Sequence, residues 1–301
     1  MLLTKRSKGL IMVCLGASMW GGSGVAGQYL LQDCGFSTGW LVVSRMLIAG
    51  VVLLLLDVCL YRESVFRIWK FRKDAGDMLV FAILGMLSVQ YTYFACIKSG
   101  NAAAATVLQY LMPVIIVGCT AAASRRLPKI HELVCVTMAV GGTFLLVTHG
   151  SLEKLAIPLE ALLWGLASAL AAAVYTMKPK RLIRKWRATL IIGWGMLLGG
   201  LCLMPLCPPW LFEGRWDMIS WLAYAYVIIF GTVMAFGCYL GSLKYIQPAE
   251  AGILGSLEPL SAIILSIVFL GASFGLMDIL GTALIICTVF LLAKRGEDSR
   301  E

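Results

Sequence analysis

The stretch "YLGSLKYIQPAEAGILGSLEP", residues 239–259, repeats a pattern that occurs 146 positions earlier as "YFACIKSGNAAAATVLQYLMP", residues 93–113. Without a gap, seven of the 21 aligned positions are identical, and both copies end on a proline, Pro113 and Pro259. A shared apolar composition does not account for identical prolines at the same depth of two apolar segments. Self-similarity at a fixed offset indicates an internal duplication. We therefore predict two homologous halves, residues 1–150 and residues 151–301.

Both copies of the repeat lie in a chain that is unusually apolar. Of its 301 residues, 60% are hydrophobic and 14% are charged, whereas soluble domains have about 45–50% apolar and about 25% charged residues. Apolar segments long enough to cross a hydrocarbon core of about 30 Å alternate with short polar joints at 9–31, 39–61, 77–97, 102–124, 131–149, 158–178, 189–210, 218–243, 249–270 and 275–293. The sequence thus predicts an all-α membrane protein with ten transmembrane helices, five in each half.

The basic residues predict the orientation of these helices. Of the 25 lysines and arginines, 21 fall before the first segment, after the last, or in alternate joints, and the positive-inside rule places these regions in the cytoplasm. Both termini are then cytoplasmic, and because each half has an odd number of helices the two halves are inverted. The net charge of +9 is therefore a topology signal in the cytoplasmic membrane. We expect the lipid bilayer as a partner and no nucleic acid.

Motifs for bound cofactors, metals or catalysis have little support. The ten cysteines show no paired spacing, there are only two histidines, and "GGSGVAG" at residues 21–27 lies in an apolar segment with no strand before it. Neither an H-E-x-x-H nor a G-x-S-x-G motif is present. We expect no metal, no cofactor and no enzyme.

The two repeated prolines predict helix breaks inside the membrane. Because proline has no N–H, Pro113 cannot donate to the carbonyl of Gln109, nor Pro259 to that of Gly255. A freed carbonyl at membrane depth needs a partner or a polar cavity. Each half is therefore expected to carry one interrupted helix.

Glu258 directly precedes the second proline, about 14 Å into its segment at the helical rise of about 1.5 Å per residue. This depth is near the middle of the bilayer, where ionisable groups are rare and mark functional sites. We expect Glu258 to bind substrate. The alternative is a protonated carboxyl that is hydrogen-bonded to a neighbouring helix at a tolerated kink.

Other polar and aromatic side chains are candidates for the same cavity. Arg45 either faces the cavity or extends to the membrane surface, and Gln109 either binds substrate or joins two helices. Aromatic residues near helix ends are commonly interface anchors, but three are predicted to bind substrate: Trp20, Tyr91 and Tyr175. Tyr93 and Tyr239 are equivalent in the repeat, and by inversion we expect them near opposite membrane faces, next to gates.

With these motifs in order, the chain resembles the EamA-type ten-helix carriers of the drug/metabolite transporter superfamily. The resemblance rests on the duplicated unit, on "WG" at residues 20–21, on "SRMLIAG" at residues 44–50 with Arg45, and on "LEPLSAIILSIVFLG" at residues 257–271. It implies a carrier of the cytoplasmic membrane that works by alternating access and often exports amino acids or other small metabolites.

The expected function is that of a secondary transporter for a small metabolite. One cation and one carboxylate at mid-depth, Arg45 and Glu258, suit a zwitterionic or neutral amphipathic compound better than a phosphorylated one, which would attract several clustered cations. Proton coupling through Glu258 is consistent with this pattern. A passive channel or an intramembrane enzyme remains an alternative, and both a monomer and a homodimer stay open.

The charge asymmetry gives a test of topology. In a variant that lacks the ten native cysteines, we expect Ser151→Cys to react with a membrane-impermeant thiol reagent added outside the cell, because residues 150–156 join two segments on the side poor in lysine and arginine. Reaction only from the cytoplasmic side would overturn the predicted topology.

Overall fold

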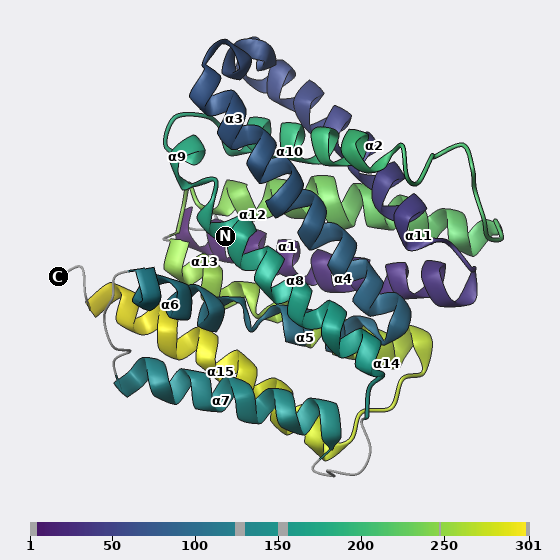
Figure 1. The fold of residues 1–301 in the computed structure, drawn as a ribbon, viewed down its shortest axis with the longest axis vertical. Coiled ribbons are helices and arrows are strands. Elements are labelled where there is room, and N and C mark those ends of the chain that lie inside the picture. The colour runs from purple at the N-terminus through teal and green to yellow at the C-terminus, as the bar shows by residue number, and fades with distance from the viewer. Residues whose placement is uncertain (1–4, 124–129, 150–155, 247, 299–301) are drawn as a thin grey trace.

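A computed structural model describes residues 5–123, 130–149, 156–246 and 248–298 (Figure 1). These residues form helices and turns with no strand, which confirms the all-α prediction. Six helical segments are long and apolar enough to cross a membrane: Lys5–Asp33, Thr38–Tyr61, Arg72–Ser99, Ala102–Ala123, Leu159–Ile183 and Met218–Ser242. Shorter apolar helices lie at the other four predicted positions: Leu133–Thr148, Ala188–Leu203, Leu257–Leu270 and Leu276–Thr288. The count of ten spans, the inversion and the cytoplasmic termini stay predictions. Most of the 150–156 joint falls outside the described residues.

Each half is a series of α-helices separated by short turns or by short helical segments. The first half contains α1 (Lys5–Gln28), η1 (Tyr29–Asp33), α2 (Thr38–Tyr61), η2 (Val65–Lys70), α3 (Arg72–Val80), η3 (Phe81–Leu87), α4 (Ser88–Ser99), α5 (Ala102–Gln109), α6 (Met112–Ala123) and α7 (Ile130–Thr148). The second contains α8 (Leu159–Met177), α9 (Lys180–Ile183), α10 (Ala188–Leu203), α11 (Met218–Ile228), η4 (Ile229–Met234), α12 (Ala235–Ser242), α13 (Pro248–Gly255), α14 (Leu257–Leu270) and α15 (Leu276–Asp298).

Both halves interrupt one helix at the repeated proline. α5 ends at Gln109 and α13 ends at Gly255, which is the same offset of 146 residues that relates the sequence repeats. Pro113 and Pro259 lie in the first turn of the following helices, α6 and α14. A proline is tolerated there because N–H groups in the first turn have no partner within the helix. The breaks therefore lie just before the prolines.

A second irregularity also repeats. η3 and η4 are π-helical turns inside otherwise α-helical spans, and they occupy overlapping positions of the two halves when the offset is applied. A π turn inserts a residue into the helix and is often found at functional sites. Together with the breaks, these turns show that the duplication is preserved in the backbone.

The first helix of each half packs into the other half. α1 contacts α11, η4, α12, α13 and α14, whereas α8 contacts η3, α4, α5 and α6. On the outside of these two bundles α2 packs against α10, and α7 packs against α15, as Figure 1 shows for the latter pair at the bottom of the view. The two sequence halves therefore interdigitate.

Ion pairs join the two halves at the end of the α2–α10 pair. Asp57 is fully buried near the end of α2 and pairs with Arg187 at 2.8 Å, while Glu63 binds the same guanidinium at 2.7 Å. Nearby, Asp74 in the first turn of α3 pairs with Lys185 at 2.6 Å and with Arg181 at 2.9 Å. The joint between α2 and α3 is thus fixed to the joint between α8 and α10.

Glycines bring α2 and α10 into close contact. A Cβ atom on Gly50 would lie 2.6 Å from the backbone nitrogen of Leu197, and Gly193 and Gly200 of α10 approach α2 in the same way from the other side. Small residues allow helix backbones to approach closely in membrane proteins. This contact holds the outer pair of helices together.

Gly50→Ala is expected to destabilise the protein by about 1–3 kcal/mol, since the added methyl group meets the backbone of α10 rather than a movable side chain. The matched control is Gly118→Ala in α6, where no atom lies within 4 Å of the new Cβ and the gain in helix propensity is the main effect. Thermal unfolding in detergent measures both. Equal midpoints for the two variants would contradict the close contact.

Candidate functional site

The two helix breaks meet each other. Tyr110, which lies between α5 and α6, donates a hydrogen bond from its hydroxyl to the carbonyl oxygen of Gly255 at 2.6 Å. This carbonyl is the one that Pro259 leaves without a helical donor. The break of the second half is therefore satisfied by a side chain from the break of the first half.

Glu258 lies beside this hydrogen bond, in the first turn of α14. Its Oε2 atom is 3.4 Å from the Tyr110 hydroxyl, and its side chain interacts electrostatically with Arg45, Tyr93 and Tyr239. The backbone of α14 packs closely on α1, where a Cβ on Gly21 would lie 2.6 Å from the carbonyl oxygen of Glu258. Among the described contacts, the carboxyl touches Tyr110 of the first half, and Arg45 is near enough for its charge to act on the carboxyl.

Arg45 points into the bundle rather than toward the membrane surface. Its side chain is buried, with 5% of the residue exposed, and its Nε atom donates to the hydroxyl of Thr232 at 2.8 Å. The guanidinium also lies over the ring of Phe94, 5.0 Å from its centre. Arg45 therefore does not extend to the membrane surface, and its role in binding substrate stays a prediction.

The π turn η4 builds the acceptor for Arg45. Thr232 donates its own hydroxyl proton to the carbonyl of Val227, five residues back, at 2.8 Å, so its oxygen is left to accept from Arg45. The carbonyl of Gly231 in the same turn is a second, longer acceptor at 3.4 Å. No sequence signal marked this turn, and Thr232 was not among the predicted residues.

Arg45 and Glu258 interact electrostatically but form no ion pair in the part of the chain that the structure describes. A buried guanidinium and a buried carboxyl that are not in contact each lack an ionic partner, so a ligand group of opposite charge would be favoured at either one when it is ionised. This pair of separated charges is the central chemical feature of the site.

The two predicted gate tyrosines approach the same carboxyl. Tyr93 shares a hydrogen bond with Thr106 at 2.8 Å, and Tyr239 packs against Trp20 with ring centres 5.2 Å apart. Both interact electrostatically with Glu258. Their placement near opposite membrane faces and their role next to gates stay predictions.

The remaining candidates lie outside the hydrogen bonds around Glu258. Gln109 donates to the hydroxyl of Ser168 at 2.7 Å, which is the helix-joining interpretation. Tyr91 packs against Trp164 of α8, and Tyr175 packs against Phe81. Neither Tyr91 nor Tyr175 has a described contact with Glu258.

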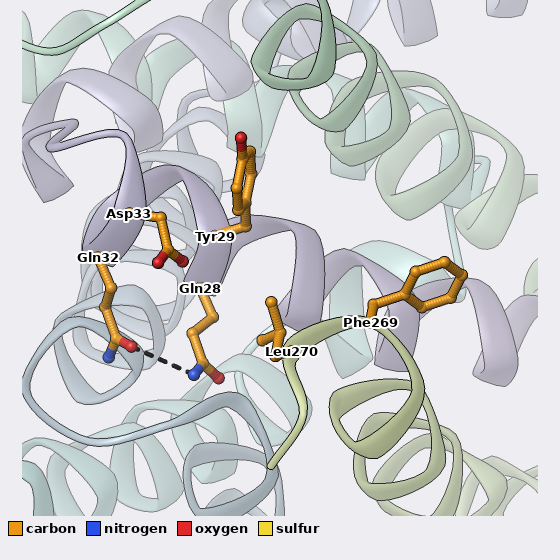
Figure 2. Close-up of a pocket in the computed structure, with 6 residues that line it drawn as sticks. All are labelled: Gln28, Tyr29, Gln32, Asp33, Phe269 and Leu270. Carbon is orange, nitrogen blue, oxygen red and sulfur yellow. Dashed lines mark hydrogen bonds between the residues drawn. The ribbon is translucent and has the colours of Figure 1, made fainter.

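A cavity of about 360 Å³ lies elsewhere, at the other end of α14 (Figure 2). It is lined by Gln28, Tyr29, Gln32, Asp33, Phe269 and Leu270, none of which was predicted. Much of its polar surface has structural partners, since Gln28 accepts from the backbone N–H of Ala102 and Gln32 donates to carbonyls at the α4–α5 turn. Leu270 is about 18 Å along the helix from Glu258, so this cavity is separate from the charged site.

A family model described as the EamA-like transporter family matches residues 7–148 and, separately, residues 159–294. The protein is therefore a membrane transporter. It belongs to the EamA-like transporter family, which confirms the resemblance in the sequence.

Three relatives agree with this assignment. The chain is 42% identical over 289 residues to the uncharacterized inner membrane transporter YicL of Salmonella typhimurium, with 95% of each chain covered. It is 26% identical to an uncharacterized transporter of Archaeoglobus fulgidus, over 73% of this chain and 78% of that one, and 26% identical to YetK of Bacillus subtilis, over 85% and 78%. The name of the first relative confirms the predicted location in the cytoplasmic membrane.

A solved crystal structure shares the fold. The two chains superpose with a TM-score of 0.64 at 20% sequence identity. The alignment covers 97% of this chain and 99% of the chain in the crystal structure. The likeness extends over both halves, so the interdigitated arrangement is that of a known fold.

The contact between Arg45 and η4 can be tested by Thr232→Val, which keeps the shape of the side chain and removes its hydroxyl. Loss of the acceptor leaves a buried guanidinium N–H without its partner, so we expect a destabilisation of about 1–3 kcal/mol. The control is Thr137→Val, where an exposed hydroxyl bonds only to its own helix. Unchanged thermal unfolding of the Thr232 variant would argue against this contact.

Proposed function

We propose that the protein is a secondary transporter that moves a small zwitterionic metabolite, such as an amino acid, out of the cell by alternating access. The observation that carries this proposal is the separated pair of buried ionisable groups, the guanidinium of Arg45 and the carboxyl of Glu258. A substrate with one carboxylate and one ammonium group would pair with both charges at once, and charge-assisted hydrogen bonds are about twice as strong as neutral ones.

The backbone around the site supports the proposal that the substrate site opens to each side of the membrane in turn. Both halves carry a broken helix and a π turn at equivalent places, and interrupted helices at a repeat interface are typical of the substrate sites of secondary transporters. Tyr93 and Tyr239 lie on equivalent helices of the two halves, α4 and α12, which suits a pair of gates that open in turn. In this scheme Glu258 holds the substrate ammonium in one step and a proton in another.

Matched ligand derivatives test the charge pair. We expect at least one amino acid to raise the thermal unfolding midpoint of the purified protein. At a concentration 100 times its Kd, such a ligand adds about 2.7 kcal/mol to the free energy of unfolding. Its N-acetyl derivative lacks the ammonium and its methyl ester lacks the carboxylate, so each should shift the midpoint much less. Equal shifts from all three compounds would contradict a site built from two charges.

Variants assign each charge to its residue. The Glu258→Gln variant should lose most of its preference for the amino acid over the N-acetyl derivative. The Arg45→Gln variant should lose most of its preference for the amino acid over the methyl ester. Glu160→Gln, which removes an exposed carboxylate that bonds to Trp164, is the control and should keep both preferences. In proteoliposomes, a Glu258→Gln protein that retains exchange but loses accumulation driven by a proton gradient would assign proton coupling to Glu258.

A further inference from the structure

We propose that Tyr110 is a positioning residue that carries the charge state of Glu258 to the backbone break between α13 and α14. This inference rests on the proposed role of Glu258 as the group that holds a proton or the substrate ammonium. Tyr110 was not predicted from the sequence, and its repeat equivalent is Ser256.

The Tyr110 hydroxyl has two neighbouring acceptors and a single proton. A tyrosine hydroxyl has one proton to donate, and it lies between two acceptors: the Gly255 carbonyl oxygen at 2.6 Å and Glu258 Oε2 at 3.4 Å. The hydroxyl has the geometry of a donor toward both oxygens, and because the contact with the carbonyl is the shorter one we assign the single proton to that side. The Tyr110 oxygen then has only lone pairs to offer the carboxyl, which suits a protonated Glu258 that donates.

An ionised Glu258 changes this arrangement. Its oxygens accept only, so two acceptors compete for the single proton of Tyr110. A hydrogen bond to a charged acceptor is the stronger one, and the hydroxyl moves toward the carboxylate. The carbonyl of Gly255 then has neither its helical donor, removed by Pro259, nor Tyr110, and the break opens to water.

Binding of a cation to Glu258 restores the original state. A proton or a substrate ammonium satisfies the carboxylate, and Tyr110 returns to Gly255. The break is thus closed when Glu258 is occupied and loosened when it is bare. The proton and the substrate ammonium compete for one carboxylate, and either of them closes the break. An exchange of substrate for proton requires this competition.

The other charged and titratable groups around Glu258 do not offer this link. Arg45 from α2, Tyr93 from α4 and Tyr239 from α12 interact with it electrostatically, and α1 presents glycine and serine. Arg45 is bound to Thr232 and Tyr93 to Thr106. Within the described residues, Tyr110 alone is recorded as contacting both the carboxyl and the freed carbonyl.

The test uses a thiol at the break and needs no substrate. Ser256→Cys places it at the single buried residue between α13 and α14, in full-length protein without native cysteines, reconstituted in lipid vesicles. The rate of modification by a water-soluble maleimide is measured across pH and divided by the rate for free glutathione at the same pH. This ratio reports the opening of the break.

The Glu258 and Tyr110 variants should change the normalised rate of modification in opposite directions. With Glu258 intact, the normalised rate should rise about five- to tenfold from acid to alkaline pH, the change expected in an opening equilibrium when one hydrogen bond is lost. Glu258→Gln, which cannot ionise and can donate to Tyr110, should stay slow at every pH. Tyr110→Phe should be fast at every pH. Tyr224→Phe, which removes a hydroxyl from the aromatic cluster around Trp40 and Trp216, should behave like the parent.

A further variant keeps the proposal testable if Tyr110→Phe does not fold. Glu258→Asp retains a titrating carboxyl but withdraws it from Tyr110 by one methylene, so the pH dependence should shrink. A rate without pH dependence in the parent, or one unchanged by Tyr110→Phe or Glu258→Asp, would overturn the proposal. If Glu258→Gln abolishes the pH response while Tyr110→Phe retains it, the link through Tyr110 is wrong and the role proposed for Glu258 stands.

Discussion

The arrangement of the two broken helices depends on one carbonyl group that needs a hydrogen-bond donor inside the membrane. Pro259 removes the helical donor for Gly255, and an unpaired carbonyl in hydrocarbon costs several kcal/mol. The hydroxyl of Tyr110 supplies the missing bond at 2.6 Å. Because this donor comes from the other half of the chain, the same bond that makes the break tolerable also brings the two broken helices together next to Glu258.

The duplicated scaffold carries an asymmetric site. Breaks and π turns occur in both halves, yet Glu258 is matched by Met112 and Tyr110 by Ser256. The arginine is equally one-sided, since Arg45 aligns with Ile191 at the repeat offset. Symmetry therefore accounts for the backbone, whereas the chemistry comes from substitutions in one copy. A backbone built from two equivalent halves can in this way carry one asymmetric site.

Part of this arrangement could be predicted from the sequence because the signals are local. Apolar length predicted the spans, and the missing N–H of proline predicted breaks at Pro113 and Pro259. Other features depend on contacts between distant residues. The inward direction of Arg45 is set by an acceptor in η4, 187 residues away, and nothing near Tyr110 in the sequence marks Gly255 as its partner. π turns have no composition of their own, so neither η3 nor η4 could be foreseen.

The interdigitation of the halves has a consequence for how the chain is made. α1 leaves the ribosome first, but its partners α11 to α14 follow only after roughly 190 more residues, a delay of about 10–40 s at common rates of synthesis. During that time the surface of α1 around Gly21, which later accepts the backbone of α14, lacks this partner, whereas Gly24 and Gly27 can already pack against Tyr93 and Phe94 of the first half. The first helix must therefore remain inserted without its partners from the second half until the last third of the chain has been synthesised.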